Sequence, residues 1–183
     1  LVAPDANPLP RTVLAAVDLD MEDAAEPETL ASLNRRVIGT ALRIAGPGNA
    51  EVFLLHSWDA LGEGLVWTFS NTGKAQSATE RYTREVREKR RRAMDMLLKE
   101  AAAEGSVVGA DRIIPRLVKG QAEQVIAEQI RSLGAEVLVM GTVARTGLEG
   151  VIIGNTAENI INSIECPVVA VKPDGFVSPI SPD

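Results

Sequence analysis

A series of glycines near the carboxyl end of the chain is the feature whose spacing points most directly to chemistry. Gly141, Gly147, Gly150 and Gly154 lie in a segment that follows an apolar run and leads into residues 155–158 (NTAE). Glycine lets a backbone approach a ligand closely, and the first turn of a helix offers unpaired N–H groups to an anion. The spacing therefore indicates an anion site at the start of a helix.

Asn155 and Glu158 also allow a purely structural interpretation. Their spacing is close to that of a capping box, in which the asparagine oxygen accepts from a backbone N–H group and the glutamate reaches back. We expect this capping role for Asn155, and the anion site is the alternative. Two common nucleotide motifs do not occur in the sequence: G-x-x-x-x-G-K-[ST], and a glycine-rich turn after the first apolar run, where residues 18–21 (DLDM) stand instead. Conventional ATPase and dehydrogenase chemistry is thereby disfavoured.

Carboxylates and the single histidine are the other groups that could do chemistry. Asp18, Asp20, Glu22 and Asp23 follow the first apolar run and could attract magnesium. Carboxylates before a helix commonly serve as its capping and dipole partners, and this is the role we expect, with no metal site. His56 ends the second apolar run without an obvious nucleophile beside it, so we expect a structural polar group.

Cys166 and the basic run Lys89 to Arg92 are also given structural roles. Cys166 starts a predicted buried strand, where we expect it to pack rather than to react. The basic run is interleaved with acidic residues, which is typical of a solvated helix face. Neither feature predicts a reaction or a partner.

Composition narrows the class of protein without naming an activity. The 183 residues carry 19 Lys+Arg against 25 Asp+Glu, a net charge of −6, and 45% are hydrophobic, as in one globular domain. One cysteine and one histidine exclude a disulfide framework and a common zinc site. The acidic balance and 3% aromatic residues argue against nucleic acid as a partner. The apolar runs are too short for a membrane span, and we expect a cytoplasmic protein.

The elements that must position these residues alternate between short β-branched runs and longer amphipathic segments. This alternation predicts an α/β fold with a parallel sheet covered by helices. Pro115 favours a sheet edge for the third strand, and residues 60–77, with Trp67 and Phe69, are predicted to be a loop that could cover a cleft. The predicted strands are 12–17, 51–57, 111–119, 136–140 and 167–171, and the predicted buried helix faces are Leu30 to Ile44, Tyr82 to Ala101, Ala122 to Leu133 and Ile160 to Ile164.

The chain resembles the universal stress proteins. The resemblance covers residues 11–173, and proline-rich tails at 1–10 and 174–183 flank this range. The residues that support it are Asp18, His56, Val-Met-Gly at 139–141, Gly154 and the segment 166–172 (CPVVAVK). Residues 141–160 (GTVARTGLEGVIIGNTAENI) look like the second half of the double-domain E branch, so we expect a piece of a tandem protein. The resemblance implies a doubly wound five-stranded parallel sheet in the order 3-2-1-4-5, of the adenine nucleotide alpha hydrolase-like type.

The resemblance also implies where an adenine nucleotide, ATP or AMP, would lie. Adenine would lie against Ala16, Val17 and Asp18, ribose near Asp18 and Met140-Gly141, and the phosphates on Gly154, Asn155 and Thr156. The family pattern has a glycine where this chain has Ala144 and a serine or threonine where it has Asn155. We therefore expect a non-enzymatic stress-response binding or assembly module with weak or absent adenine nucleotide binding.

The sequence is also compatible with two other functions, and it predicts one mode of assembly. One alternative is an ATP-binding domain with slow hydrolysis, and the other is a cleft for a non-nucleotide or apolar metabolite under Trp67 and Phe69. The predicted fifth strand, residues 167–171, is apolar on both faces although the resemblance implies an edge position. We expect it to pair with its counterpart in a homodimer or in a second universal stress protein domain.

Overall fold

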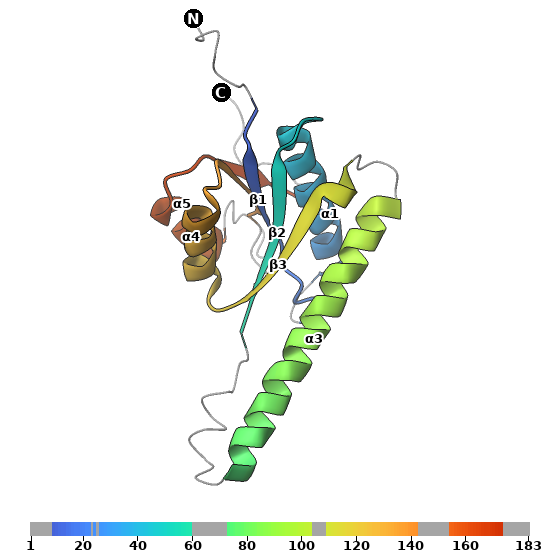
Figure 1. Cartoon of the computed structure of the whole chain (residues 1–183), viewed down its shortest axis with the longest axis vertical. Helices are drawn as coiled ribbons and strands as arrows, with labels where there is room; N and C mark the ends of the chain where they lie inside the picture. The colour runs from blue at the N-terminus through green and yellow to red at the C-terminus, as the bar shows by residue number, and fades with distance from the viewer. Residues whose placement is uncertain are drawn as a thin grey trace, which may run out of the picture.

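Five parallel strands form a single sheet in the order β3-β2-β1-β4-β5 (Figure 1). The structure is a computed structural model that describes residues 9–22, 24, 26–59, 73–103, 109–142 and 154–173. The predicted strand order is confirmed, and Pro115 lies in the edge strand β3, as expected. The strands are β1 (Thr12–Ala16), β2 (Glu51–Trp58), β3 (Ile113–Lys119), β4 (Val137–Gly141) and β5 (Val168–Val171), and the helices are α1 (Pro27–Ala45), α3 (Gly73–Ala103), α4 (Ala122–Leu133) and α5 (Asn155–Ser163), with a 3-10 turn at Ala110–Arg112.

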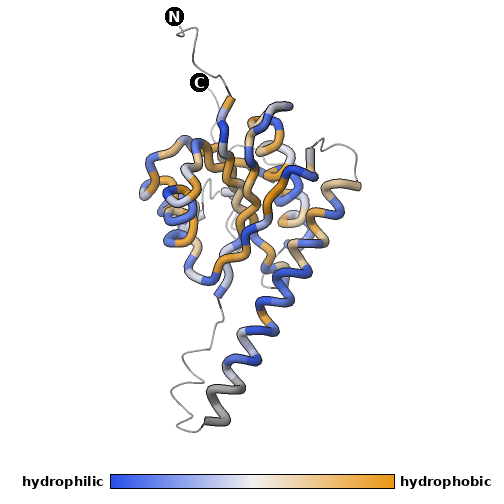
Figure 2. Tube along the Cα trace, in the orientation of Figure 1, coloured by the Kyte–Doolittle hydropathy of each residue, from blue (hydrophilic) through white to orange (hydrophobic). Residues whose placement is uncertain are grey.

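Helices cover both faces of the sheet, so its central strands are buried on both sides. Figure 1 shows α1 and α3 on one side of the sheet and α4 and α5 on the other. Successive residues of β1 alternate between two apolar cores: Val13 packs with the α1 and α3 side chains, and Leu14 packs with those of α4 and α5. Strands buried on both faces read as continuous apolar runs, which explains the composition of residues 12–17. Figure 2 shows these apolar strands at the centre of the domain.

Glycines end two of the helices in the backbone region that L-residues avoid. Gly46 has a φ of 65° at the end of α1 and donates to the Leu42 and Arg43 carbonyl oxygens. Gly134 has a φ of 61° after α4 and donates to the Ile130 carbonyl oxygen. Glycine is the residue most often found at such helix ends, because it has no Cβ that would clash at a positive φ.

Two boundaries differ from the sequence prediction by more than one residue, and one predicted buried face is exposed. The loop predicted for 60–77 ends earlier, because α3 begins at Gly73 and continues through residues of good helix propensity. Asp111 and Arg112 form a 3-10 turn instead of the start of β3. Tyr82, predicted on the buried face of its helix, is 41% exposed. The amino-terminal half of α3 extends past the end of the sheet, so apolar residues at helical spacing in that half have no core to pack against (Figure 1).

Two further sequence predictions concern the surroundings of the sheet. The proposed cover by Trp67 and Phe69 lies outside the described residues. No helix in the described part of the chain is long and apolar enough to cross a membrane.

Candidate functional site

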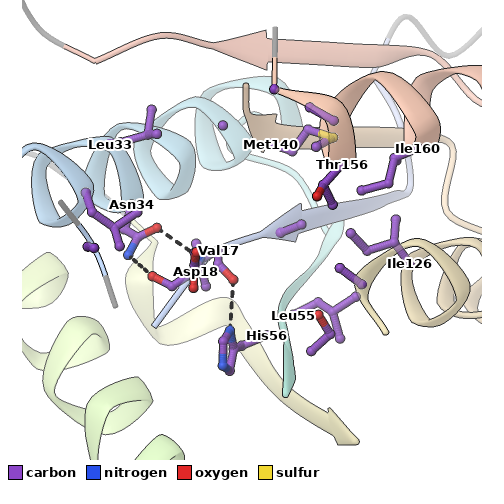
Figure 3. A pocket seen from close by; sticks show the side chains of 18 of the residues that line it. Val17, Asp18, Leu33, Asn34, Leu55, His56, Ile126, Met140, Thr156 and Ile160 are labelled. Atoms are coloured by element: carbon purple, nitrogen blue, oxygen red, sulfur yellow. Dashed lines mark hydrogen bonds between the residues drawn. The ribbon is translucent and has the colours of Figure 1, made fainter. Parts of the chain in front are cut away.

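A cavity of about 590 Å³ lies beyond the carboxyl ends of β1, β2 and β4 (Figure 3). In an open parallel sheet this edge, at the point where the strand order reverses, is the usual position of a ligand. The cavity volume falls within the range of small-molecule sites. Every site residue that the resemblance implied lies in its wall: Ala16, Val17, Asp18, Met140, Gly141, Gly154, Asn155 and Thr156.

The helices supply walls that the sequence prediction missed. Leu30 and Leu33 of α1 and Ile126 of α4 line the cavity, together with Leu55 of β2. The one sequence signal for this wall is Asn34, a polar residue on the otherwise apolar face of α1, where it is 2% exposed. A polar residue at a core-facing position marks a site with a specific hydrogen-bond requirement.

Asp18 is the first residue beyond the hydrogen-bonded end of β1. Val17 still donates to the Leu55 carbonyl oxygen at 2.9 Å, as in a continued ladder. At Asp18, the side chain of Asn34 makes the backbone hydrogen bonds in place of a strand. Its Oδ1 accepts from the Asp18 N–H at 3.2 Å, and its Nδ2 donates to the Asp18 carbonyl oxygen at 2.7 Å (Figure 3). The Asp18 carboxylate accepts from the Asp20 N–H at 3.0 Å. The backbone at Asp18 is therefore held from α1.

His56 lines the cavity and binds the backbone on both sides of Asp18 rather than the Asp18 carboxylate. Its Nδ1 lies 3.1 Å from the Val17 carbonyl oxygen and 3.3 Å from the Leu19 nitrogen, and the residue is 2% exposed. Burial lowers the pKa of His56 from its usual value of 6.5, against the opposite effects of the Val17 carbonyl, Asp20 and Asp18. The structural role expected for His56 agrees with these contacts.

Asp18, Asp20 and Glu22, which follow β1, do not have the capping role predicted from the sequence. Asp20 forms an ion pair with Arg90 of α3, and Glu22 forms one with Lys89. Glu26 occupies the position before α1, so the carboxylates nearer β1 are too far from its first turn to cap it. Lys89, Arg91 and Arg92 are exposed, as expected for a solvated helix face, whereas the Arg90 side chain is largely buried and ties α3 to this loop. Asp23, the remaining residue of that group, lies outside the described residues.

The start of α5 forms the wall associated with an anion. Gly154 stands before the helix, and the Glu158 N–H donates to its carbonyl oxygen at 2.9 Å. Asn155 is thus the first residue of the helix and is exposed, so the prediction that its side chain caps the helix is wrong. The first N–H groups of any helix have no partner within it, and here they border the cavity.

The two ends of the glycine-containing segment meet beside the cavity. The Gly154 N–H donates to the Thr142 carbonyl oxygen at 2.9 Å, which closes the segment on itself. A Cβ at Gly141 would come within 2.6 Å of Leu33 Cδ2, so glycine lets α1 pack close to the end of β4. Gly147, Gly150 and Ala144 lie outside the described residues.

The last two candidates are a reactive Cys166 and a metal site, and the described part of the chain supports neither. Burial raises the pKa of the Cys166 thiol, and the side chain packs against the core between the sheet and α4 and α5. This agrees with the packing role expected for it. Within the described residues, His, Cys, Asp and Glu side chains form no group of three that could hold a metal ion.

Comparison with known proteins identifies the relatives of this fold. Universal stress protein E of Salmonella typhi is 38% identical over 73 residues, 40% of this chain and 23% of that protein. The matched segment thus spans about a quarter of that relative. A functionally unknown protein of Pseudomonas aeruginosa PAO1 is 29% identical, with a TM-score of 0.58 over 92% of this chain and 50% of the other. That half coverage agrees with the expected resemblance to one half of a double-domain protein.

Two more distant structures share the fold alone. The hypothetical protein MJ0577 has a TM-score of 0.66 at 17% identity, over 91% of this chain and 98% of the other. A universal stress protein in complex with cAMP has a TM-score of 0.52 at 18% identity, over 89% and 97%. The model of the Universal stress protein family matches residues 11–172, a range that includes the whole described sheet and its helices. The chain belongs to the universal stress protein family.

Proposed function

We propose that this universal stress protein domain is a binding module without turnover, and that the cavity beyond β1 and β4 holds its ligand. The main observation behind the proposal is that two kinds of polar group line the same cavity. Asp18, at the end of β1, offers a carboxylate to hydroxyl or amino groups, and the first turn of α5 offers backbone N–H groups to an anion. A ligand with both kinds of group satisfies both walls.

An adenine nucleotide has this combination of groups, and it is the ligand class we propose. The apolar side chains of Val17, Leu55 and Met140 provide surfaces for a flat base. A family relative of the same fold has been solved in complex with cAMP, which supports the ligand class. We propose weak affinity, because Asn155 stands where the family pattern has a hydroxyl residue and Ala144 stands where it has glycine.

We propose that the domain does not hydrolyse its ligand, because His56, the strongest candidate for a general base, is buried and already hydrogen-bonded. His56 is buried, its Nδ1 already interacts with the loop backbone, and burial lowers its pKa. A general base must reach the proton that it removes, and this ring nitrogen is occupied. The other ring nitrogen, Nε2, has no hydrogen-bond partner among the described residues, but it is buried and so does not reach a ligand proton. Slow hydrolysis of ATP, one of the two alternatives from the sequence, would therefore need another base.

The test is calorimetric titration of ATP and AMP into the chain and its Asp18→Asn variant. We expect measurable binding by the parent, weaker binding by the variant, and no ATP turnover above a control without protein. Asp111→Asn is the matched control, since it makes the same chemical change at an exposed residue in the 3-10 turn. Equal affinities of parent and Asp18→Asn would overturn the proposed site.

A second ligand class is favoured by a different observation. Most of the wall is apolar, with Leu30, Leu33, Ile126, Met140 and Ile160 facing one space. A small apolar metabolite would therefore also bury its surface there. Mass spectrometry of molecules released from the denatured protein separates the two classes: a nucleotide supports the first, and an apolar compound the second.

The same domain is proposed to assemble through β5. This strand lies at the sheet edge next to β4, so one row of its backbone groups has no neighbouring strand in the described part of the chain. Edge strands of this kind are templates for pairing with a second chain. We propose an antiparallel β5–β5 contact, either in a homodimer or with a second universal stress protein domain.

A further inference from the structure

The backbone that presents Asp18 to the cavity is held by two buried side chains from different elements. Asn34 reaches it from α1, and His56 reaches it from β2. We propose that Asn34 and His56 are positioning residues for the ligand site, which fix the segment Val17–Leu19 so that Asp18 faces the ligand. This inference rests on the proposed ligand site at Asp18 and adds the residues that control it.

Asn34 replaces the neighbouring strand that Asp18 lacks. A primary amide carries one acceptor and one donor group, the same pair that a peptide group presents in a sheet. Its two bonds satisfy both backbone polar groups of Asp18, at 3.2 and 2.7 Å. Burying an amide on an apolar helix face is costly unless both of its groups are paired. The pairing with Asp18 meets that condition and fixes the backbone dihedral angles that aim the carboxylate.

His56 holds the same segment through one atom with two alternative partners. Nδ1 lies within hydrogen-bond distance of the Leu19 nitrogen and of the Val17 carbonyl oxygen, on either side of Asp18. A neutral ring with its proton on Nε2 accepts from the Leu19 N–H, whereas a ring with a proton on Nδ1, whether neutral or charged, donates to the Val17 carbonyl and leaves the Leu19 N–H without that acceptor. The presence or absence of a proton on His56 Nδ1 therefore decides which backbone contact the ring makes beside Asp18.

Charged groups from the neighbouring elements affect the protonation of the His56 ring. Asp18 and Asp20 of the loop favour the protonated form, and Arg90 of α3 opposes it. Burial is the largest effect and favours the neutral ring. Protonation of the neutral ring commits Nδ1 to the Val17 carbonyl oxygen and removes the Leu19 contact.

The first arm of the test needs no ligand. Because His56 is the only histidine in the chain, its ring proton signals in an NMR titration are unambiguous. We expect the Leu19 amide shift to follow the same midpoint as the ring, and the Asp18 amide to exchange at least about tenfold faster in Asn34→Ala. Ile38→Val, a core truncation on the same helix, is the matched control and leaves the Asp18 exchange unchanged. A Leu19 amide that ignores the His56 titration, or unchanged Asp18 exchange in Asn34→Ala, overturns the inference.

The second arm asks whether Asn34 acts on the ligand through Asp18. In a double-mutant cycle, Asn34→Ala should weaken ATP binding by about tenfold in the parent and by much less in Asp18→Asn, because the carboxylate that Asn34 positions is gone. Equal losses in both backgrounds would show a general structural effect and overturn the inference. If Asn34→Ala does not fold, Asn34→Ser, which keeps one hydrogen-bonding group, replaces it.

The two arms separate this inference from the proposed function. If the parent chain binds no ATP, the proposed nucleotide ligand fails, and the exchange and titration data still decide whether Asn34 and His56 hold the segment. If ATP binds equally well to the parent and to Asn34→Ala, the nucleotide site stands and the positioning role is overturned.

Discussion

Arg90 of α3 forms an ion pair with Asp20, two residues beyond the ligand-site residue Asp18. Both side chains are largely buried, with 14% and 16% of their surfaces exposed. Arg90 also donates to the Leu19 carbonyl oxygen at 3.5 Å. The helix that extends beyond the sheet (Figure 1) is thus attached to the loop that lines the cavity, and α1, β2 and α3 all contact that loop through Asn34, His56 and Arg90.

Arg90→Ala should therefore destabilise the domain far more than removal of the neighbouring lysine. Without the guanidinium, the Asp20 carboxylate stays largely buried and loses this cation, which typically costs about 2–4 kcal/mol of the free energy of unfolding. Urea denaturation followed by circular dichroism measures the loss. Lys89→Ala is the control, because its pair with Glu22 is exposed to solvent and screened, so little change is expected. Equal losses in the two variants would contradict the importance of the Arg90 pair.

The sheet could be predicted from the sequence because its signals are local. Residues 12–17 form an uninterrupted apolar run, as a strand buried on both faces requires, and Pro115 fits the edge strand that it indicates. Gly46 and Gly134 end helices in the conformation for which glycine is preferred. In each case, a few consecutive residues carry the information.

The site was predicted only in part because its remaining residues come together through tertiary contacts. The resemblance implied residues on β1, β4 and α5, and all of them line the cavity. Asn34 and Arg90 lie in helices far along the chain from their partners, and helical periodicity does not say what an odd polar residue contacts. The capping prediction for Asn155 failed by one position, because a spacing motif does not fix which residue starts the helix.

The stability of the domain should depend on pH through His56. Its pKa is lowered in the folded state, so below the unfolded value of about 6.5 the unfolded chain binds the proton more readily. The contribution of the neutral ring is therefore complete above pH 6.5 and is lost as the pH falls through the lowered folded-state pKa. Urea midpoints at pH 7.5 and 5.5 measure the loss, and in His56→Gln the part due to this residue should disappear. An unchanged pH dependence in His56→Gln would contradict the assignment.

Assembly through β5 should be sensitive to charge on that strand and not on the opposite edge. Val169→Lys places a cation in the proposed antiparallel contact, and we expect it to convert a dimer into a monomer in sedimentation experiments at roughly tens of micromolar. Ile114→Lys is the matched control on the edge strand β3, where the side chain is already 38% exposed, so the dimer should persist. A monomeric parent, or a dimer that survives Val169→Lys, would show that β5 is not the interface.

The weak nucleotide affinity that we propose should be reversible at two positions. Asn155→Ser restores a hydroxyl at the first residue of α5, where the side chain is exposed beside the cavity, and a hydrogen bond from that hydroxyl to a charged phosphate contributes about 1.5–3 kcal/mol. Ala144→Gly restores the glycine of the family pattern, which removes a methyl group where backbone approaches phosphate. Together the changes should raise the affinity for ATP by on the order of a hundredfold, measured by calorimetry beside the parent.

The effect of the double change should be confined to the phosphate end of the ligand. Binding of adenosine, which has the base and ribose but no phosphate, should be the same in the parent and in Ala144→Gly/Asn155→Ser, because Ala16, Val17 and Asp18 are unaltered. The single variant Asn155→Ala serves as the control for loss of the asparagine alone, and no gain is expected from it. Tight ATP binding by the parent would show that the backbone N–H groups at the start of α5 suffice. A gain for adenosine as large as that for ATP would show that the changes act on the whole cavity rather than on the phosphate wall.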